Sequence, residues 1–268
     1  MNKNGIIVVG ANSKIFKIFI SKYYQKNNDY FLYSRSDPKL KFTYVFYKWS
    51  LNQTLNLNQI KNYKKLKILI FVHDWKKYNE QFHLSRFKKL IINIKKIEKK
   101  LKIEKKIYFS SFSSNKNSYN FYGKIKNKIE KKFYINNYKI VRISLITGSK
   151  KFFHYLKMKE NSKKKIIVIP HSEEKFQIIN INDLCNKINK ILHDKSKNKI
   201  YNLGSKKRFS LKELIIKFSK KQKHIFIEIN LNLVLIITRI LSKFKLIDYR
   251  TYDSLKGLKR QIYYKDLY

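Results

Sequence analysis

The sequence has little cysteine and no leader-like segment. Cys185 is the single cysteine among 268 residues, which excludes an intramolecular disulfide framework and a zinc site built on several thiolates. No His, Cys and carboxylate residues have the spacing of a metal site. The N-terminus passes directly into the β-branched run at residues 5–10, without the apolar stretch and cleavage site of a signal peptide. We therefore expect a cytoplasmic protein that holds no metal.

Long apolar segments are also absent. The most apolar late segment, residues 231–241, is too short to cross a bilayer and contains Arg239. It predicts a helix that is buried or lies at an interface, and it leaves a weak peripheral membrane contact open. The sequence does not decide the oligomeric state, and a homodimer is one of the options.

Acidic residues and arginine are scarce beside lysine. The chain has 62 basic and 17 acidic residues, a formal net charge of +45, and only seven of the basic residues are Arg. Clustered cations neutralise phosphates, but specific recognition of nucleic acids favours the bidentate guanidinium fork. Lysine is instead spread through nearly every segment. The composition favours weak adhesion to polyanions over specific nucleic-acid binding, which we rank third among the candidate functions.

Strand-like and helix-like segments alternate along the first half of the chain. Short apolar runs, typical of strands buried in a parallel sheet, occupy residues 5–10, 29–33, 42–47, 66–72, 106–111 and 139–143. Helical spacing occupies residues 13–24, 78–101 and 118–134. Because such alternation gives βαβ units, the sequence predicts an α/β fold with a doubly wound parallel sheet.

The second half is less regular. It predicts strands at residues 176–181 and 199–203, and helices at 182–193, 210–220 and near 231–243. Ser210 and Glu213 have the spacing of a capping box, in which each side chain accepts from a backbone amide at a helix start.

The turn after the first strand reads GANSKIF, residues 10–16. A glycine turn at this place can bring backbone amides and a helix N-terminus against a pyrophosphate. Only Gly10 remains of a G-x-x-G-x-x-G spacing, with Ser13 and Phe16 at the other two places. The chain can still turn at Ser13, whose hydroxyl can donate a hydrogen bond. The bulky side chain of Phe16, in contrast, should push the helix away from the sheet or force the helix to repack. The motif alone leaves dinucleotide binding and an ordinary turn equally open.

Arg35 follows the second strand, where dinucleotide-binding folds select their cofactor. An acidic residue there accepts from a ribose hydroxyl, whereas an arginine can pair with a 2′-phosphate. The position favours NADP, with NAD as the alternative. A solvated loop arginine is an equally good interpretation in so basic a chain.

A serine-rich strand end followed by Tyr122 and Lys126 is the strongest catalytic candidate. Five Tyr-x-x-x-Lys spacings occur, and about four are expected by chance among so many tyrosines and lysines. Only Tyr122 also follows a serine-rich strand end and opens a helix, where residues i and i+4 share a face. We expect Lys126 to lower the phenol pKa so that Tyr122 exchanges a proton near neutral pH. Ser111, or Ser113 if the loop is offset, would hydrogen-bond the reacting oxygen.

His73 and Asp74 follow the fourth strand, at the edge where α/β folds bind ligands. They could form a catalytic dyad. The interpretation that we favour is that they line a cofactor cleft or cap the next segment.

Together these landmarks resemble the extended short-chain dehydrogenase/reductase family, also called the NAD-dependent epimerase/dehydratase family. The matching segments follow the family order over roughly the first 220 residues: IIVVGANSKIF, YSRS, ILIFVHDW, IYFSSFSS, FYGKIKNKIEK, IVRISLITG, FQIININDL and YNLGSKKRFSLKELI. The segment from residue 108 to 131 and the late DSLKGL, residues 253–258, are most similar to members in cell-surface polysaccharide biosynthesis.

The resemblance implies a Rossmann domain at residues 1–150 that binds NAD(P), and a small lobe at 151–268, interleaved with it, for a nucleotide-sugar or related carbohydrate substrate. It implies that Tyr122 is the acid/base, that Lys126 holds the nicotinamide ribose and tunes Tyr122, and that Ser111 orients the substrate oxygen. The other cofactor residues that it implies are Gly10, Asn12, Ser13, Ile15, Arg35, Val72, His73 and Ile143.

The sequence therefore predicts an NADP-linked epimerase, dehydratase or reductase in which Tyr122 moves the proton that accompanies hydride transfer. It departs from the family at Phe16, at Ser50, where an aspartate facing the adenine is usual, and at His73, where a small residue is usual. The rival hypothesis is a catalytically degraded Rossmann scaffold that holds a cofactor structurally or not at all and contacts a partner.

Overall fold

The structure is a computed structural model that describes residues 4–51, 53, 55–56, 60, 63, 65–72, 79–152, 158, 160–161, 163–218, 224–265 and 267–268. The chain divides into two compact units. The first unit comprises Met1–Ser110, Lys128–Arg142 and Leu184–Tyr201, and the second comprises Ser111–Asn127, Ile143–Asp183 and Asn202–Tyr268.

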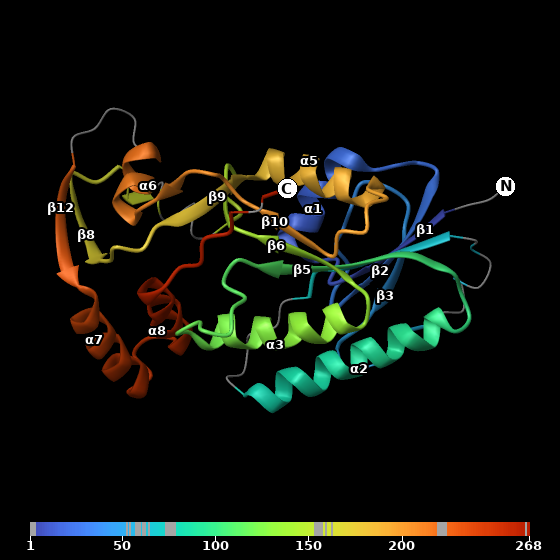
Figure 1. Cartoon of the computed structure of the whole chain (residues 1–268), viewed down its shortest axis with the longest axis horizontal. Coiled ribbons are helices and arrows are strands. Elements are labelled where there is room, and N and C mark those ends of the chain that lie inside the picture. The colour runs from blue at the N-terminus through green and yellow to red at the C-terminus, as the bar shows by residue number, and fades with distance from the viewer. Residues whose placement is uncertain are drawn as a thin grey trace. The chain divides into compact units, whose positions relative to one another are not determined.

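The first unit is built on a seven-stranded sheet (Figure 1). Its order is β10-β6-β5-β4-β1-β2-β3. The bounds are β1 Asn4–Val9, β2 Asn28–Ser34, β3 Val45–Lys48, β4 Lys65–Ile70, β5 Ile103–Ser111, β6 Lys139–Ile143 and β10 Ile200–Leu203. The central strand β1 pairs in parallel with β2 and with β4, so that Val9 lies opposite both Tyr33 and Ile70. The order of strands reverses beside β1, which is the position where doubly wound sheets bind ligands at their carboxyl ends.

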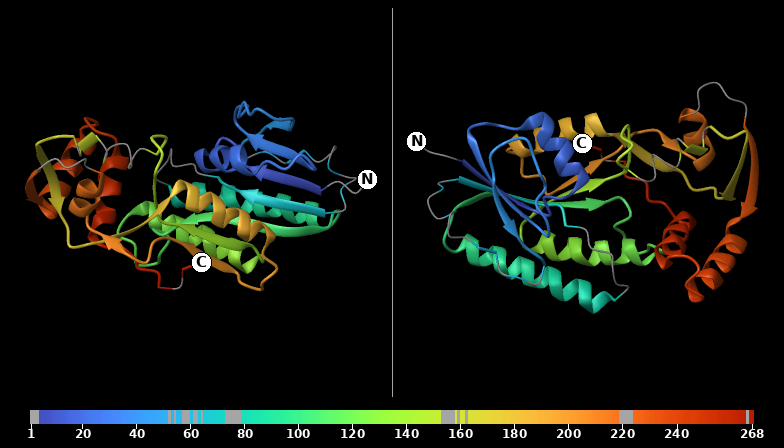
Figure 2. Two further views of the ribbon diagram at one scale, coloured as in Figure 1. Left: turned by 90° about the horizontal axis from the view of Figure 1, so that it is seen from above. Right: turned by 180° about the vertical axis from the view of Figure 1, so that it is seen from behind.

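Four helices accompany this sheet. Figures 1 and 2 show α1 (Lys14–Tyr23) and α5 (Ile181–His193) on one face and α2 (Glu80–Glu98) and α3 (Phe121–Ile135) on the other. The central strands are apolar on both faces because helices cover both; Ile7, Val8 and Ile68 are fully buried. The predicted doubly wound α/β fold is confirmed.

The second unit contains two small sheets. One has the order β11-β9-β7, with bounds β7 Leu145–Thr147, β9 Phe176–Asn180 and β11 Arg208–Phe209. The other is the parallel pair β8 (Ile166–His171) and β12 (Ile225–Asn230). The helices of this unit for which the structure gives bounds are α6 (Leu211–Phe218), α7 (Leu231–Lys243), α8 (Tyr249–Lys256) and the 3-10 turn Gly257–Lys259. Leu214 of α6 packs with Ile178 of β9, whereas Ile215 packs on the inner face of β8.

The predicted capping box is confirmed at the start of α6. The Ser210 amide donates to the Glu213 carboxylate at 2.6 Å, and the Glu213 amide donates to the Ser210 hydroxyl at 3.1 Å. This reciprocal pair satisfies two amides that the helix itself cannot satisfy.

Several elements differ from the sequence prediction. In the second unit, strands β7, β8, β11 and β12 and helix α8 are not predicted by the sequence. In the first unit, β3 begins three residues later than the predicted strand at residue 42. The outer residues of β8 and β12 are as apolar as the inner ones, so their sequences lack the polar alternation of a half-exposed strand. Helix α8 is short and polar, and its cap, Asp248, is the clearest signal for it.

The C-terminal tail is tied to β9 by one glutamine. The Gln177 side chain donates to the Tyr264 carbonyl at 3.0 Å and accepts from the Tyr264 amide at 2.9 Å. The Tyr264 hydroxyl donates to the Ser114 carbonyl at 3.2 Å, and its ring lies 4.6 Å from that of Phe112. The tail therefore closes over the serine-rich loop that follows β5.

Among the described residues, no helix has the length and apolar character needed to cross a membrane.

Candidate active site

The turn between β1 and α1 keeps the backbone geometry of a glycine turn. Gly10 has φ +87°, a conformation that glycine adopts without steric cost. The Ser13 amide donates to the Gly10 carbonyl at 2.9 Å, and the Gly10 amide donates to the Tyr33 carbonyl at 2.8 Å. A Cβ on Gly10 would lie 3.0 Å from the Phe71 backbone. The turn thus lies against the end of β4 with no room for a side chain.

Phe16 is accommodated by an aromatic row under α1. Its side chain is fully buried and its ring lies 5.7 Å from that of Phe71, which stacks on Phe109 at 3.9 Å. The sequence offered two outcomes for this bulky residue, displacement of the helix or repacking. The structure shows an aromatic layer at the ends of β4 and β5 that accepts the ring.

The start of α1 is not closed by its own cap residue. Ser13 is the N-cap, and its side chain makes no capping hydrogen bond. The neighbouring Asn12 donates from Nδ2 to the Ser36 carbonyl at 2.5 Å and to the Ser34 hydroxyl at 3.3 Å, which fixes the loop after β2 against the turn. Arg35, between these two serines, is exposed.

The other cofactor residues that the resemblance implied in the first unit are Ile15, Val72 and His73. Ile15 is half-buried in the first turn of α1 and Val72 is buried just beyond β4. His73 and Asp74 lie outside the described residues. Two observations show that this turn suits a dinucleotide. Gly10 has a positive φ and packs directly against backbone, and the side chain of Ser13 does not cap the start of α1.

In the second unit the structure brings Ser111 and Tyr122 together. The Tyr122 phenol is hydrogen-bonded to the Ser111 side chain. Burial raises the phenol pKa to about 12, while the hydrogen bond from Ser111 acts in the opposite direction. The expected lowering of this pKa is therefore wrong, because loss of hydration disfavours the phenolate more than the hydrogen bond from Ser111 favours it. The phenol is protonated at neutral pH.

Lys126 follows one turn later on α3 and is almost completely buried. Buried lysines are rare unless they are paired or serve a function. The helical spacing places Lys126 and Tyr122 on the same face of α3. Ile143, the last implied cofactor residue, is buried at the end of β6, and its carbonyl accepts from the Phe112 amide at 3.0 Å.

The start of α3 is closed by side chains that the sequence did not reveal. The buried carboxylate of Asp253 accepts from the Phe121 amide at 2.7 Å and from the Tyr122 amide at 3.1 Å. Asn120 accepts from the Gly123 amide at 3.0 Å. Three successive amides at the helix start are thus satisfied, two of them by a residue 131 or 132 positions away. The only sequence signal was the DSLKGL segment, whose first residue is Asp253.

Gly123 is required where Tyr122 leaves the loop. A Cβ on Gly123 would lie 2.3 Å from the Ser113 carbonyl and 2.2 Å from the Ser118 hydroxyl, which is far inside contact distance. The serine-rich loop therefore packs directly on the backbone of α3 beside Tyr122.

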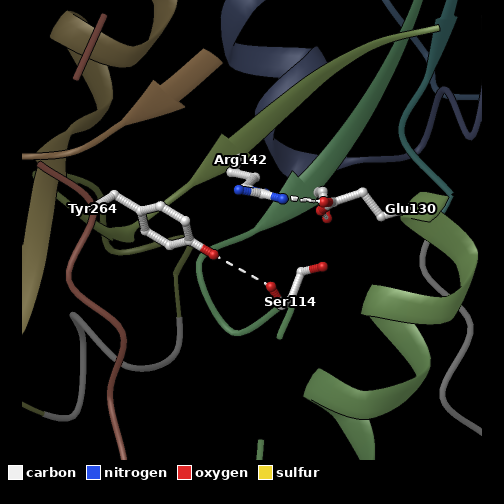
Figure 3. Close-up of polar contacts among 5 residues, drawn as sticks. Ser114, Glu130, Arg142 and Tyr264 are labelled. Carbon is white, nitrogen blue, oxygen red and sulfur yellow. Dashed lines mark hydrogen bonds and ion pairs between the residues drawn. The ribbon is translucent and has the colours of Figure 1, made fainter. Parts of the chain in front are cut away.

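Within the first unit, a buried ion pair lies further along α3 (Figure 3). Glu130 accepts from Nε of Arg142 at 3.0 Å and from the Ser110 hydroxyl at 2.8 Å. These contacts join α3 to β6 and β5. Figure 3 also shows the Tyr264 hydroxyl directed at the Ser114 carbonyl in the second unit. The buried Ser114 hydroxyl itself has no hydrogen-bond partner among the described residues.

No protein-family model matches the sequence, and no curated protein matches it significantly. Solved structures match the fold. The ADP-L-glycero-D-manno-heptose-6-epimerase of Helicobacter pylori has a TM-score of 0.64 at 13% identity, covering 85% of this chain and 86% of that one. The UDP-glucose 4-epimerase of Thermotoga maritima, solved with UDP-glucose, gives 0.62 at 12%, covering 84% and 85%. The UDP-glucuronic acid 4-epimerase of Bacillus cereus, solved with NAD, gives 0.60 at 15%, covering 84% and 87%. The fold implied by the resemblance is thereby confirmed.

Proposed function

We propose that this chain, which shares its fold with nucleotide-sugar epimerases, is an NAD(P)-dependent enzyme of the extended short-chain dehydrogenase/reductase family. Its substrate would be a sugar nucleotide or a related carbohydrate, and its reaction an epimerisation, dehydration or reduction. The observation that carries the proposal is the hydrogen bond between Ser111 and Tyr122 at a helix start that also bears the buried Lys126. In our proposal the Rossmann domain, residues 1–150, holds the cofactor, and the interleaved lobe, residues 151–268, binds the sugar.

The nicotinamide cofactor, when bound, would supply the hydride acceptor and donor. Gly10, Asn12, Ser13 and Ile15 would hold its pyrophosphate, and Val72 and Ile143 would line the rest of its site. Backbone amides at the start of α1 suit an anion because they point outward along the helix axis and carry partial positive charge. The close packing of Gly10 on the Phe71 backbone supports this role.

Tyr122 would exchange the proton. Because burial raises its pKa to about 12, it is an acid at neutral pH and would donate to a carbonyl oxygen as that oxygen gains negative charge. Ser111, which is hydrogen-bonded to the phenol, would also donate a hydrogen bond to this carbonyl oxygen. In the reverse direction the phenolate of Tyr122 would take the proton from the substrate hydroxyl, and Lys126, one turn away on the same face of α3, would hold the nicotinamide ribose.

A variant of Tyr122 tests the proposal against a matched control. Tyr122→Phe removes only the phenolic oxygen, so we expect turnover to fall by about 10²- to 10⁴-fold while NADPH affinity is kept. Tyr252→Phe is the control, because Tyr252 has the same spacing to a lysine, Lys256, but lies on α8. The assays are NADPH and NADH titration by calorimetry, and turnover of a panel of sugar nucleotides by the full chain.

The rival scaffold hypothesis predicts different results. If millimolar NADPH and NADH do not bind, or if Tyr122→Phe keeps full activity, the catalytic proposal is wrong. Equal losses in the Tyr122 and Tyr252 variants would indicate damage to the lobe and would also contradict a specific role for Tyr122.

The choice of cofactor depends on Arg35 in our proposal. Its guanidinium is exposed beside the loop that Asn12 fixes, where it would pair with the 2′-phosphate of NADP. Arg35→Gln should weaken NADPH about tenfold and leave NADH affinity nearly unchanged, since a charge-assisted pair is lost only with NADP. Equal affinities of the native chain for NADPH and NADH would contradict this assignment.

A further inference from the structure

Helix α7 has an apolar face whose side chains remain about half exposed or more among the described residues. Its members recur at i, i+3, i+4, i+7 and i+11, which places them in one stripe along the helix. We call them the α7 stripe: Leu233, Ile236, Ile237, Ile240 and the C-cap Phe244, with exposures of 51%, 57%, 47%, 49% and 73%. The opposite side of α7 is also apolar, and Leu235 there is buried in the second unit. Helix α7 therefore has both a core-facing side and a second apolar side.

Such a face is unusual for a helix at the surface of a protein. Scattered exposed apolar residues are normal, but a continuous apolar stripe marks a surface that binds something. Leu246 continues the exposure beyond the helix at 71%. In Figure 1, β12 leads directly into α7 beside β8, so the helix belongs to a folded part of the second unit.

The charged side chains of α7 itself and of the three residues that follow it are all basic. Arg239 and Lys243 lie four residues apart on one flank of the stripe, and Lys245 follows the helix; all three are exposed. No acidic residue occurs from residue 231 to residue 247. Long basic side chains of this kind can extend from an apolar face to reach anionic headgroups.

The length of α7 determines how it could meet a lipid bilayer. Its 13 residues span about 20 Å at 1.5 Å per residue, which is shorter than the hydrocarbon core of about 30 Å. The flanking cations also oppose burial of the whole helix. An amphipathic helix with these properties lies in the plane of the membrane interface.

We propose that the α7 stripe docks on an anionic phospholipid surface. The aliphatic and aromatic side chains of the stripe enter the boundary between headgroups and acyl chains, and Arg239, Lys243 and Lys245 contact the headgroup phosphates. Charge complementarity selects this occupant over a second copy of the chain. A symmetric dimer through α7 would bring two sets of the same cations together in a chain whose net charge is +45.

Vesicle co-sedimentation of the full chain tests the proposal. One vesicle set is phosphatidylcholine alone and the other is phosphatidylcholine mixed with phosphatidylglycerol. We expect binding to the anionic vesicles and at least a tenfold loss in the double variant Ile236→Glu, Ile240→Glu. The control is Ile92→Glu, which changes a similarly exposed isoleucine on α2 and should alter binding less than twofold.

A second pair of variants separates the basic flank of α7 from the charge of the whole chain. Arg239→Gln with Lys243→Gln should weaken binding about tenfold, whereas Lys88→Gln with Lys89→Gln on α2 removes the same charge and should have a smaller effect. In Leu233→Trp, tryptophan emission should shift to the blue on anionic vesicles. Circular dichroism verifies that every variant is folded.

Three outcomes would overturn the proposal. The first is no binding to phosphatidylglycerol vesicles. The second is equal loss in the α7 and α2 variants, which would indicate adhesion by net charge alone. The third is a native chain that does not bind vesicles but forms a dimer in analytical ultracentrifugation, together with a double glutamate variant that is monomeric. A second copy of the chain would then cover the stripe.

Discussion

Helices α1 and α3 both begin directly after a parallel strand or its loop, but they are fixed in opposite ways. At α3, side-chain oxygens of Asp253 and Asn120 accept from the first three amides, and the buried Glu130 ties its middle to two strands. At α1 the cap residue Ser13 makes no such bond, and the helix is held by apolar packing of Phe16 and its neighbours.

The difference shows what each helix start can do. A start whose amides are already satisfied cannot bind an anion, but it holds the side chains of its first turn in one position. A helix start whose amides are not capped by the side chain of its own N-cap residue suits a phosphate. This division agrees with our proposal that α1 holds the cofactor and that α3 holds Tyr122.

The largest effect is expected where α3 is anchored by charge. Glu130→Gln removes the charge that balances Arg142, and both side chains are largely buried. Breaking a buried pair from one side leaves an uncompensated charge, so we expect a loss of about 3 kcal/mol in the free energy of unfolding. Urea unfolding followed by circular dichroism measures it.

The control for this change is a second ion pair on the same helix. Lys128 and Glu80 pair at the surface, where such contacts contribute less than about 1 kcal/mol. Glu80→Gln should therefore change stability little. Similar losses of stability in Glu130→Gln and Glu80→Gln would show that burial does not make the Glu130–Arg142 pair more stabilising than the surface pair.

The next effect concerns the cap of α3. Asp253→Asn keeps the shape of the side chain but turns one of its two acceptors into an amide donor, which then faces the amide of Phe121 or Tyr122. We expect a loss of about 2 kcal/mol in stability and a larger relative loss in turnover than in cofactor affinity, because the first turn of α3 carries Tyr122. The matched control is Asp248→Asn, since Asp248 caps α8 at an exposed position. A variant at Asp253 that is as stable and active as the control would contradict the positioning role.

The contrast also explains which parts were predictable. Six of the seven strands of the sheet followed from apolar runs that alternate with helical spacing, the seventh from the predicted strand at 199–203, and the α6 capping box from two residues three positions apart. All of these signals are local. The cap on α3 was not predictable, since Asp253 lies more than 130 residues from its partners. The spacing between tyrosine and lysine alone did not distinguish Tyr122 and Lys126 from the other pairs in the chain. The serine-rich strand end before Tyr122 was also needed.

The fit of Phe16 and the pKa of Tyr122 needed the structure for a different reason. Whether a large ring fits beneath α1 depends on Phe71, which directly follows β4, and on Phe109 of β5. Whether a phenol gains or loses acidity depends on the balance of burial against hydrogen bonds, and burial raises the pKa of Tyr122 to about 12. No sequence pattern reports that balance.

A smaller effect is expected at the glycine of the α1 turn. Gly10→Ala places a Cβ at positive φ and against the Phe71 backbone, at a cost of about 1 to 2 kcal/mol. We also expect cofactor affinity to fall at least tenfold, because the backbone of the turn must shift. Gly148→Ala is the control, since Gly148 also has a positive φ, of 86°, but faces the Asn180 side chain. It should lose comparable stability and keep cofactor affinity, as calorimetric titration would show.

The smallest change in stability, and the sharpest test of the contrast, is expected at Ser13. Because its hydroxyl does not cap α1, Ser13→Ala should alter the free energy of unfolding by less than about 0.5 kcal/mol. Ser210→Ala, which removes a cap that is made, should cost about 1 kcal/mol. If the Ser13 hydroxyl contacts the pyrophosphate, Ser13→Ala will lower NADPH affinity several-fold despite its neutral effect on folding, and Ser210→Ala will not. A Ser13 variant that loses stability but binds NADPH as the native chain does would contradict this assignment. Ser13 would then stabilise α1 as a cap, and the start of α1 would not be available to the cofactor.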